Sequence, residues 1–361
     1  MNQKLNKKNC HRVLLAAGGP KGKYIPALSV ALELRKHSRN INLMWVGNGK
    51  GKDRSICRKY RIPFLHSAMN EEKRIGSVID CFREFFRFTS LFGKEKPSAV
   101  LAFGGFESLP VLAAARFRSV PYFLLEQNAV PGSVNRFFAG GAKKVFFGLP
   151  PVDLQSSDSS REVTGVPVWP FVKEYDQSFY PKRLDRNKKT VFIAGDDEKE
   201  SFLFLADLVK NWLSDGIQVV WQTGKRHYGQ IRSALKTSEG VFLFPALKDA
   251  YPFYAVSRLV IGRGFPSLLS EAAFFGLPCV LIPVSTESPQ WVNAGLVKNQ
   301  GWAFRFAQSE GCEQEIDSAI RTILENQELF EKMSRKALDH SPFNASSRIT
   351  GLIAEELGIS A

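Results

Sequence analysis

The stretch VLLAAGGPKGKYIPALSVALELRK, residues 13–36, decides the fold of this chain. Its first five residues are apolar and predict a buried strand. The glycines and lysines of residues 18–23 predict a tight, positively charged turn. A helix is expected from about residue 26 to residue 36, with Pro26 in its first turn, where the missing N–H costs nothing. A strand, a glycine turn and a helix in this order predict a βαβ unit and a parallel sheet.

The same alternation continues along the chain. Further strands are expected at residues 43–46, 99–103, 122–125 and 144–147, and then at 190–194, 217–222, 241–244, 259–261 and 279–282. Between the two series, the loose, polar residues 176–189 predict a hinge. We therefore predict an α/β protein with two doubly wound parallel-sheet domains facing across a cleft. The expected boundaries are 1–168 and 190–343 for the domains, 169–189 for the hinge, and 344–361 for a C-terminal helix that packs back on the first domain.

Composition narrows the class of protein. The 361 residues are enough for two domains, and 44% hydrophobic with 23% charged residues is ordinary for a globular protein. The net charge of +14 predicts an anionic partner, either a phosphorylated substrate or an anionic membrane surface, with a generically basic surface as the alternative. No zinc-finger spacing occurs, so we expect no nucleic acid.

The cysteines and the apolar runs indicate the cellular compartment of the protein. The five cysteines are widely spaced and form no CxxC pair, which favours a reducing compartment over a disulfide or zinc scaffold. No run of about 18 uncharged apolar residues predicts a membrane span. We therefore expect a cytoplasmic protein.

Several loops after predicted strands carry polar groups, at the edge where open α/β sheets bind ligands. The turn at residues 18–23 offers backbone N–H groups and a helix N-terminus to an anion. Glu271 lies in an apolar helix, where a carboxylate acceptor would suit the two hydroxyls of a ribose. The amides of Gln290 and Asn293 suit sugar hydroxyls. Tight turns, surface carboxylates and helix caps are the structural alternatives.

In order and spacing, these loops resemble those of the MurG family of bacterial peptidoglycan glycosyltransferases. The segments that carry the resemblance are GGFESLP (104–110), EQNAVPGSVN (126–135), RGFPSLLSEAAFFGLP (263–278) and ESPQWVNA (287–294). The resemblance covers essentially the whole chain and implies a GT-B fold without a bound metal or other cofactor. It also implies transfer of N-acetylglucosamine from its UDP donor to the polyprenyl-linked lipid I, which forms lipid II. The protein would bind peripherally to the inner face of the cell membrane, with cell-wall synthesis proteins as candidate partners.

The resemblance also implies roles for single residues. Asn128 would lie near the acceptor and donor phosphates, Glu271 would hold the ribose, and Arg263–Ser270 would hold the diphosphate. Gln290 would hold the donor sugar, and Leu247 would lie beside the uracil. The other candidate binding residues are Gly19, Lys21, Gly22, Gly104, Gly105, Asn135, Gly264, Pro266, Ser267 and Asn293.

Two loops depart from the family. Lys23 stands where the family has a histidine, and residues 195–200, GDDEKE, replace a glycine-rich loop with carboxylates that would repel a diphosphate if they faced it. Lys23, Glu107 and Glu126 are the catalytic candidates. An ordinary lysine is a poor base at neutral pH, so a glutamate is expected to take the acceptor proton, with Glu107 favoured. The departures leave two alternatives, a catalytically impaired scaffold for lipid intermediates or partner proteins, and an enzyme with another donor or acceptor.

A segment rich in phenylalanine and arginine predicts contact with an anionic membrane surface. Phe82, Phe85 and Phe86 fall on one helical face by their spacing, with Arg83 and Arg87 next to them in the sequence. Aromatic and basic side chains together suit a bilayer interface. A helix that faces the core is the alternative.

Overall fold

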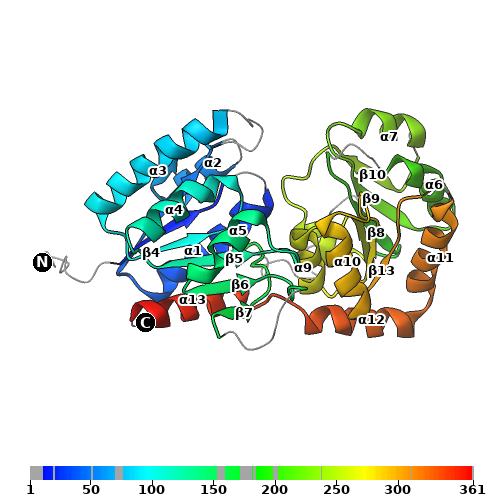
Figure 1. Ribbon diagram of the computed structural model, residues 1–361. Helices are drawn as coiled ribbons and strands as arrows, with labels where there is room; N and C mark the ends of the chain where they lie inside the picture. The colour runs from blue at the N-terminus through cyan, green and yellow to red at the C-terminus, as the bar shows by residue number, and fades with distance from the viewer. Residues whose placement is uncertain are drawn as a thin grey trace, which may run out of the picture. The chain divides into compact units, whose positions relative to one another are not determined.

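The computed structural model describes residues 11–18, 21–49, 52–69, 76–152, 159–170, 181, 184–197, 202–236, 238–309 and 311–359. The chain divides into two compact units, one formed by residues 1–170 and 343–361 and the other by residues 171–342. Each unit contains one parallel sheet between layers of helices (Figure 1).

The sheet of the first unit has seven parallel strands in the order β3-β2-β1-β4-β5-β6-β7. On the central strand β1, Val13 lies opposite Leu43 on one side and Ala99 on the other. Central strands are buried on both faces, which is why their sequences are almost continuously apolar. The strands are β1 (His11–Ala16), β2 (Ile41–Gly47), β3 (Phe64–His66), β4 (Ala99–Ala102), β5 (Tyr122–Glu126), β6 (Lys144–Phe147) and β7 (Arg161–Val163).

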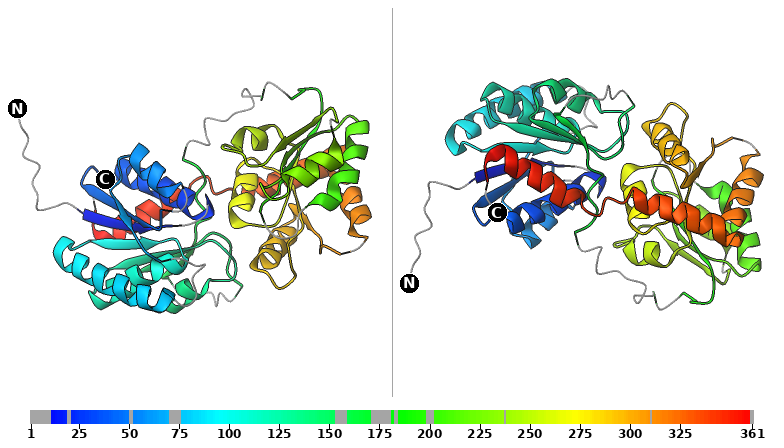
Figure 2. Two further views of the ribbon diagram at one scale, coloured as in Figure 1. Left: turned by 90° about the horizontal axis from the view of Figure 1, so that it is seen from above. Right: turned by 90° about the horizontal axis from the view of Figure 1, so that it is seen from below.

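Helices cover both faces of this sheet. Three of them, α1 (Lys21–His37), α2 (Asp53–Lys59) and α13 (Ala345–Leu357), contribute to the core on one face. The other face is covered by α3 (Gly76–Glu95), α4 (Leu109–Phe117) and α5 (Ser133–Phe138), and the short 3-10 helix η2 (Phe106–Ser108) precedes α4. The last helix, α13, packs against α1, as the red and blue helices of Figure 2 show.

The second unit has six parallel strands in the order β10-β9-β8-β11-β12-β13. Helices α6, α7 and α11 contribute to the core on one face, and right-handed crossovers put α8, α9 and α10 on the other. The strands are β8 (Thr190–Ala194), β9 (Gln218–Gln222), β10 (Val241–Phe244), β11 (Leu259–Gly262), β12 (Cys279–Leu281) and β13 (Ala303–Arg305). The helices are α6 (Ala206–Ser214), α7 (Tyr228–Leu235), α8 (Tyr251–Val256), α9 (Pro266–Phe274), α10 (Pro289–Asn299), α11 (Cys312–Glu325) and α12 (Gln327–Asp339).

The prediction of two doubly wound parallel sheets is confirmed. The sequence reasoning missed β3, β7 and β13, each of which lies at the edge of its sheet. An edge strand is paired on one side only, so its sequence need not be a continuous apolar run.

The predicted start of the first helix is wrong. Helix α1 begins at Lys21, so Pro26 lies inside the helix, and Lys23 belongs to a helical turn instead of a loop. The side chains of Tyr24 and Ile25 are buried in the core of the first unit. Their burial offsets the hydrogen bond that a proline removes from a helix.

Candidate functional site

Strand order reverses once in each sheet, between β1 and β4 in the first unit and between β8 and β11 in the second. In open parallel sheets, ligands bind outside the carboxyl ends of the strands at such a reversal. The loops that leave these four strands carry many of the predicted site residues. Each unit therefore presents one candidate site.

At the reversal in the first unit, Lys23 meets Glu107. Lys23 lies in the first turns of α1 and Glu107 in η2, and the distance from Lys23 Nζ to Glu107 Oε1 is 3.4 Å. Glu107 is 4% exposed, so this carboxylate is held in the protein with a cation beside it. Gly105 has a φ of +87°, and a Cβ there would collide with Lys23 Nζ and lie 2.6 Å from Glu107 Oε2. Only glycine leaves room for the pair.

Other predicted residues of this loop region are only partly described. Gly104, with a φ of +74°, follows the strand β4 and lies against the amide of Asn135. Gly19 lies outside the described residues. For Lys21 and Gly22 the structure gives the helical backbone of α1 and not the side chains.

Glu126, at the end of β5, organises the loop that follows it. Its Oε1 accepts from the Asn128 backbone N–H at 3.0 Å and from Asn128 Nδ2 at 3.4 Å. Its Oε2 accepts from the Gly132 N–H and from Asn135 Nδ2, both at 2.9 Å. Both carboxylate oxygens are thus occupied by N–H donors, and the side chain is buried. This geometry fits a structural carboxylate and leaves Glu107 as the better candidate base.

At the reversal in the second unit, the N-terminus of α9 lies at the carboxyl edge of the sheet. The helix begins at Pro266 after the extended residue Phe265, and no described side chain caps it. Gly264 has a φ of +86°, and a Cβ there would lie 2.8 Å from the Gln290 carbonyl oxygen. The free backbone N–H groups that follow Pro266, including that of Ser267, give this edge a partial positive charge that suits an anion.

The side chain of Arg263, the first residue of the segment predicted to hold a diphosphate, is fully buried. Its Nη1 donates to the Ile282 carbonyl at 3.0 Å and to Gln308 Oε1 at 2.8 Å, and its guanidinium lies 4.1 Å from the centre of the Phe202 ring. Its Nε lies 4.0 Å from Asp196 Oδ2. A buried guanidinium needs such partners, and these contacts connect the loops that follow β8, β11 and β12.

The acidic loop that replaces glycines is also engaged with the protein. Asp196 pairs with buried Arg263, and Asp197 Oδ1 accepts from the Arg226 N–H at 3.0 Å. Residues 198–200 lie outside the described part of the chain. For the two described carboxylates, partners within the protein reduce the repulsion of a diphosphate that the sequence predicts.

Glu271 occupies the sixth position of α9 and is 8% exposed. Its Oε1 accepts a hydrogen bond from Tyr251 Oη at 2.9 Å, and Tyr254 lies one turn further along α8. Burial and the charge of Glu271 raise the pKa of Tyr254 well above its usual value, so that hydroxyl stays a donor. The sequence reasoning missed both tyrosines, because they form no motif.

The remaining predicted residues of the second unit lie near these loops. Asn293 is buried in α10, and its Nδ2 donates to the Gly264 carbonyl at 3.2 Å. Gln290, on the first turn of the same helix, has a buried Oε1 with no hydrogen-bond partner among the described residues. Leu247 is half-buried in the loop after β10, and its N–H donates to Gln222 Oε1 at 3.1 Å.

An exposed aromatic patch lies on the helix layer of the first unit. Phe85 is partly exposed, packs against the core of the first unit and contacts the Phe117 ring at 5.8 Å. Arg83 pairs with Asp80 at 3.1 Å and Arg87 with Glu84 at 2.8 Å, which reduces the positive charge beside the patch. The patch consists of Val78, Ile79, Phe82, Phe86 and Phe117, each between 60% and 75% exposed.

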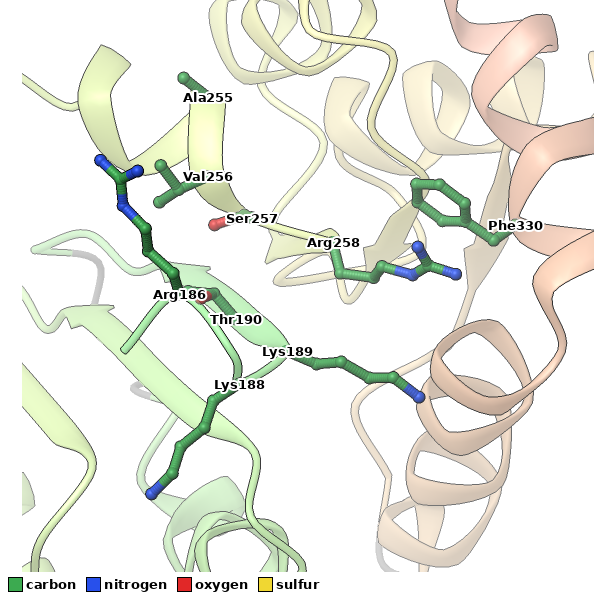
Figure 3. Close-up of a pocket in the computed structure, with 9 residues that line it drawn as sticks. All are labelled: Arg186, Lys188, Lys189, Thr190, Ala255, Val256, Ser257, Arg258 and Phe330. Atoms are coloured by element: carbon green, nitrogen blue, oxygen red, sulfur yellow. The ribbon is translucent and has the colours of Figure 1, made fainter. Parts of the chain in front are cut away.

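A cavity of about 390 Å³ opens at the opposite, amino-terminal edge of the second sheet (Figure 3). Arg186, Lys188, Lys189 and Arg258 line it, but the side chains of Arg186 and Lys188 point in opposite directions. Lys189 Nζ donates to the Leu324 carbonyl at 2.7 Å, and the guanidinium of Arg258 lies over the Phe330 ring. These cations do not converge on one point, so the cavity does not form a second anion site.

Two further observations concern membranes and metals. Among the residues that the structure describes, no helix has the length and apolar character needed to cross a bilayer. Within the same ranges, no cluster of three or more His, Cys, Asp or Glu side chains is placed to hold a metal ion.

Two parallel α/β sheets, each with polar loops at the reversal of strand order, define a GT-B-like fold. The N-terminal domain of glycosyltransferase family 28 matches residues 13–147, and the C-terminal domain of the same family matches residues 190–348. The chain belongs to this glycosyltransferase family.

Individual relatives agree along almost the whole chain. A protein of Bacillus licheniformis named UDP-N-acetylglucosamine–N-acetylmuramyl-(pentapeptide) pyrophosphoryl-undecaprenol N-acetylglucosamine transferase is 26% identical over 369 residues, covering 95% of this chain and 98% of the relative. The crystal structure of Acinetobacter baumannii MurG has a TM-score of 0.73 at 21% identity, covering 96% of this chain and 99% of that one. The similarity to MurG is thus confirmed, and the structural likeness shows a shared fold.

The fold is also shared with a different class of enzyme. The UDP-GlcNAc 2-epimerase of Neisseria meningitidis, solved with UDP-GlcNAc bound, has a TM-score of 0.72 at 17% identity. The comparison covers 95% of this chain and all of that one. Because one fold hosts both activities, a function for this chain has to be argued from its own residues.

Proposed function

We propose that the chain is a glycosyltransferase that moves N-acetylglucosamine from UDP-N-acetylglucosamine to undecaprenyl-pyrophosphoryl-MurNAc-pentapeptide at the inner face of the membrane. One observation carries the proposal. Helix α9 combines an N-terminus that suits a diphosphate with a carboxylate that suits a ribose. Ser267 and Glu271 are four residues apart, which puts them on one helix face about 6 Å apart along the axis. A nucleoside diphosphate spans a similar distance between its phosphate and its ribose.

The remaining residues support the same donor and acceptor. The chain keeps Gln290 for the donor sugar and Asn128 for the phosphates, as in the family that it resembles. We assign the donor to the second unit and the lipid-linked acceptor to the first. The name of the Bacillus relative supports this choice of substrates.

We assign the proton transfer to Glu107. The acceptor hydroxyl oxygen forms a bond to the anomeric carbon of the donor while the bond from that carbon to the UDP oxygen breaks. The hydroxyl proton passes to the Glu107 carboxylate, which Lys23 holds in place from 3.4 Å. The negative charge that develops on UDP meets the N–H groups of α9.

The aromatic patch supports a peripheral membrane location. Five adjacent apolar side chains that are more than half exposed are unusual on a monomer surface and suit insertion into a bilayer interface. Because Arg83 and Arg87 pair with acidic neighbours, apolar contact is expected to contribute more than charge.

The test is transfer of labelled sugar from UDP-N-acetylglucosamine to a lipid I analogue in vesicles. We expect Glu107→Gln to lower kcat by about 100- to 10,000-fold without changing UDP affinity. Glu271→Ala is expected to weaken UDP binding. A wild-type protein that binds UDP but transfers nothing would favour the scaffold alternative. Transfer from another nucleotide sugar alone would favour a shifted donor.

A further inference from the structure

The carboxylate of Glu271 is held from one side by the hydroxyl of Tyr251. Tyr251 Oη donates to its Oε1 at 2.9 Å, and Tyr254 lies one turn further along α8. Both tyrosines are buried, with 3% and 2% of their surfaces exposed. The carboxylate cannot rotate without breaking this charge-assisted hydrogen bond.

The two phenol rings are themselves fixed by packing. Tyr254 stacks on Phe275 with ring centroids 6.0 Å apart and an interplanar angle of 5°, and it meets Phe192 edge-on at 5.0 Å. Tyr251 lies 6.4 Å from both Tyr254 and Phe275. The Tyr251 donor is therefore positioned before any ligand arrives, so no ordering of this side chain opposes binding.

An ionised carboxylate has about four acceptor positions. Tyr251 uses one of them, on Oε1, and among the described residues no other side chain donates to this carboxylate. The remaining positions, including those of Oε2, are enough to accept from the two hydroxyls of a ribose. We propose that Tyr251 is a positioning residue that turns Glu271 toward both hydroxyls, so that the site selects ribonucleotides over 2′-deoxyribonucleotides. This inference rests on the proposed function, because it takes Glu271 as the ribose acceptor.

The same tyrosine connects the ribose site to the loop that carries Leu247. The Tyr251 backbone N–H donates to Asp249 Oδ1 at 3.1 Å, which fixes the end of this loop at the start of α8. One residue thereby sets the orientation of the carboxylate and ties it to the loop that the family resemblance places beside the base.

The experiment is calorimetric titration of the full-length protein with UDP and with 2′-deoxy-UDP, which needs neither donor sugar nor lipid. We compare the wild type with Tyr251→Phe, Tyr254→Phe and Glu271→Ala. Phe275→Leu is the matched control, because it loosens the same aromatic cluster without removing a hydroxyl. We expect the wild-type protein to bind UDP about tenfold or more tightly than 2′-deoxy-UDP, because the deoxy compound lacks one hydrogen bond to a charged group.

We expect Tyr251→Phe to reduce this preference to about threefold or less. Phe275→Leu is expected to weaken the binding of both nucleotides equally. Tyr254→Phe removes a hydroxyl from the same cluster and leaves the Tyr251 bond to Glu271, so the preference is expected to survive. Its loss in Tyr254→Phe would overturn the specific role of Tyr251. An unchanged preference in Tyr251→Phe, beside a lost preference in Glu271→Ala, overturns the role of Tyr251 and leaves the proposed function intact. Failure of the wild type to bind UDP overturns both.

Discussion

Replacing Glu126 by glutamine separates a structural carboxylate from a catalytic one. In the native structure, four N–H donors surround this side chain at 2.9 to 3.4 Å. Glutamine has one carbonyl oxygen and one NH₂ group in place of two carboxylate oxygens. Its NH₂ group, which is itself a donor, must therefore face two of the four N–H donors. The better orientation keeps the oxygen toward Gly132 and Asn135 and loses the two bonds from Asn128.

The cost follows from these contacts. A hydrogen bond to a charged group contributes about 1.5 to 3 kcal/mol, and a neutral one about 1 kcal/mol. Losing the bond from the Asn128 backbone, and weakening those from Gly132 and Asn135, gives a destabilisation of about 3 kcal/mol. In a unit of this size, that free energy lowers the melting temperature by roughly 6 to 12 °C.

Scanning calorimetry of the full-length chain measures this shift. Glu33→Gln is the matched control, because Glu33 makes an exposed ion pair with Lys36, 3.2 Å away and three residues along α1. Such surface pairs contribute less than about 1 kcal/mol. The reasoning is refuted if the melting temperature of Glu126→Gln lies within roughly 2 °C of that of Glu33→Gln.

Three further results are expected. Changing Phe82 and Phe86 together to serine removes two exposed rings and should lower binding to vesicles that contain phosphatidylglycerol by at least about tenfold, measured by sedimentation. Gly105→Ala places a methyl group against Glu107 at a positive φ and should lower transfer activity by at least about tenfold. Burial raises the pKa of Cys57 to about 12, with a further contribution from a nearby aspartate. The unfolded chain then loses this proton first, so stability should fall above about pH 9, by up to about 1.4 kcal/mol per pH unit.

Each of these has a control. Phe137→Ser removes an exposed ring outside the patch and should leave vesicle binding unchanged. Gly140→Ala meets no atom within 4 Å and should leave activity unchanged. In urea titrations between pH 8 and 11, Cys57→Ala should lose less stability than the wild type as pH rises. Equal slopes for the two proteins would contradict the assignment to this thiol.

The sheets could be predicted from the sequence because central parallel strands are buried on both faces. Residues 259–261 are apolar throughout and lie in β11, whereas the edge strand β13, Ala303–Arg305, ends in an arginine and was missed. The start of α1 was misplaced because glycine and proline each disfavour a helix locally. The burial of Tyr24 and Ile25, which depends on the tertiary structure, stabilises the helix that begins at Lys21.

The candidate site was harder to predict than the fold. The sequence singled out Lys23 and Glu107 separately, but they are 84 residues apart, and their pairing follows from the strand order. Glu126 resembled a catalytic carboxylate because two of its four donors are backbone N–H groups, which have no sequence signature. Tyr251 belongs to no motif, and only its contact with Glu271 reveals it.

The packing of α13 on α1 has a consequence for how the protein is made. The chain leaves the first unit at residue 170 and returns to it at residue 343, so Ile349 and Ile353 complete a core whose other residues were synthesised much earlier. The second unit is whole before those residues leave the ribosome and can fold first, although it comes later in the sequence. A released fragment that ends at residue 342 should therefore contain a protease-resistant second unit joined to a first unit that is still open to digestion. A premature stop near the C-terminus would damage the unit formed at the N-terminus.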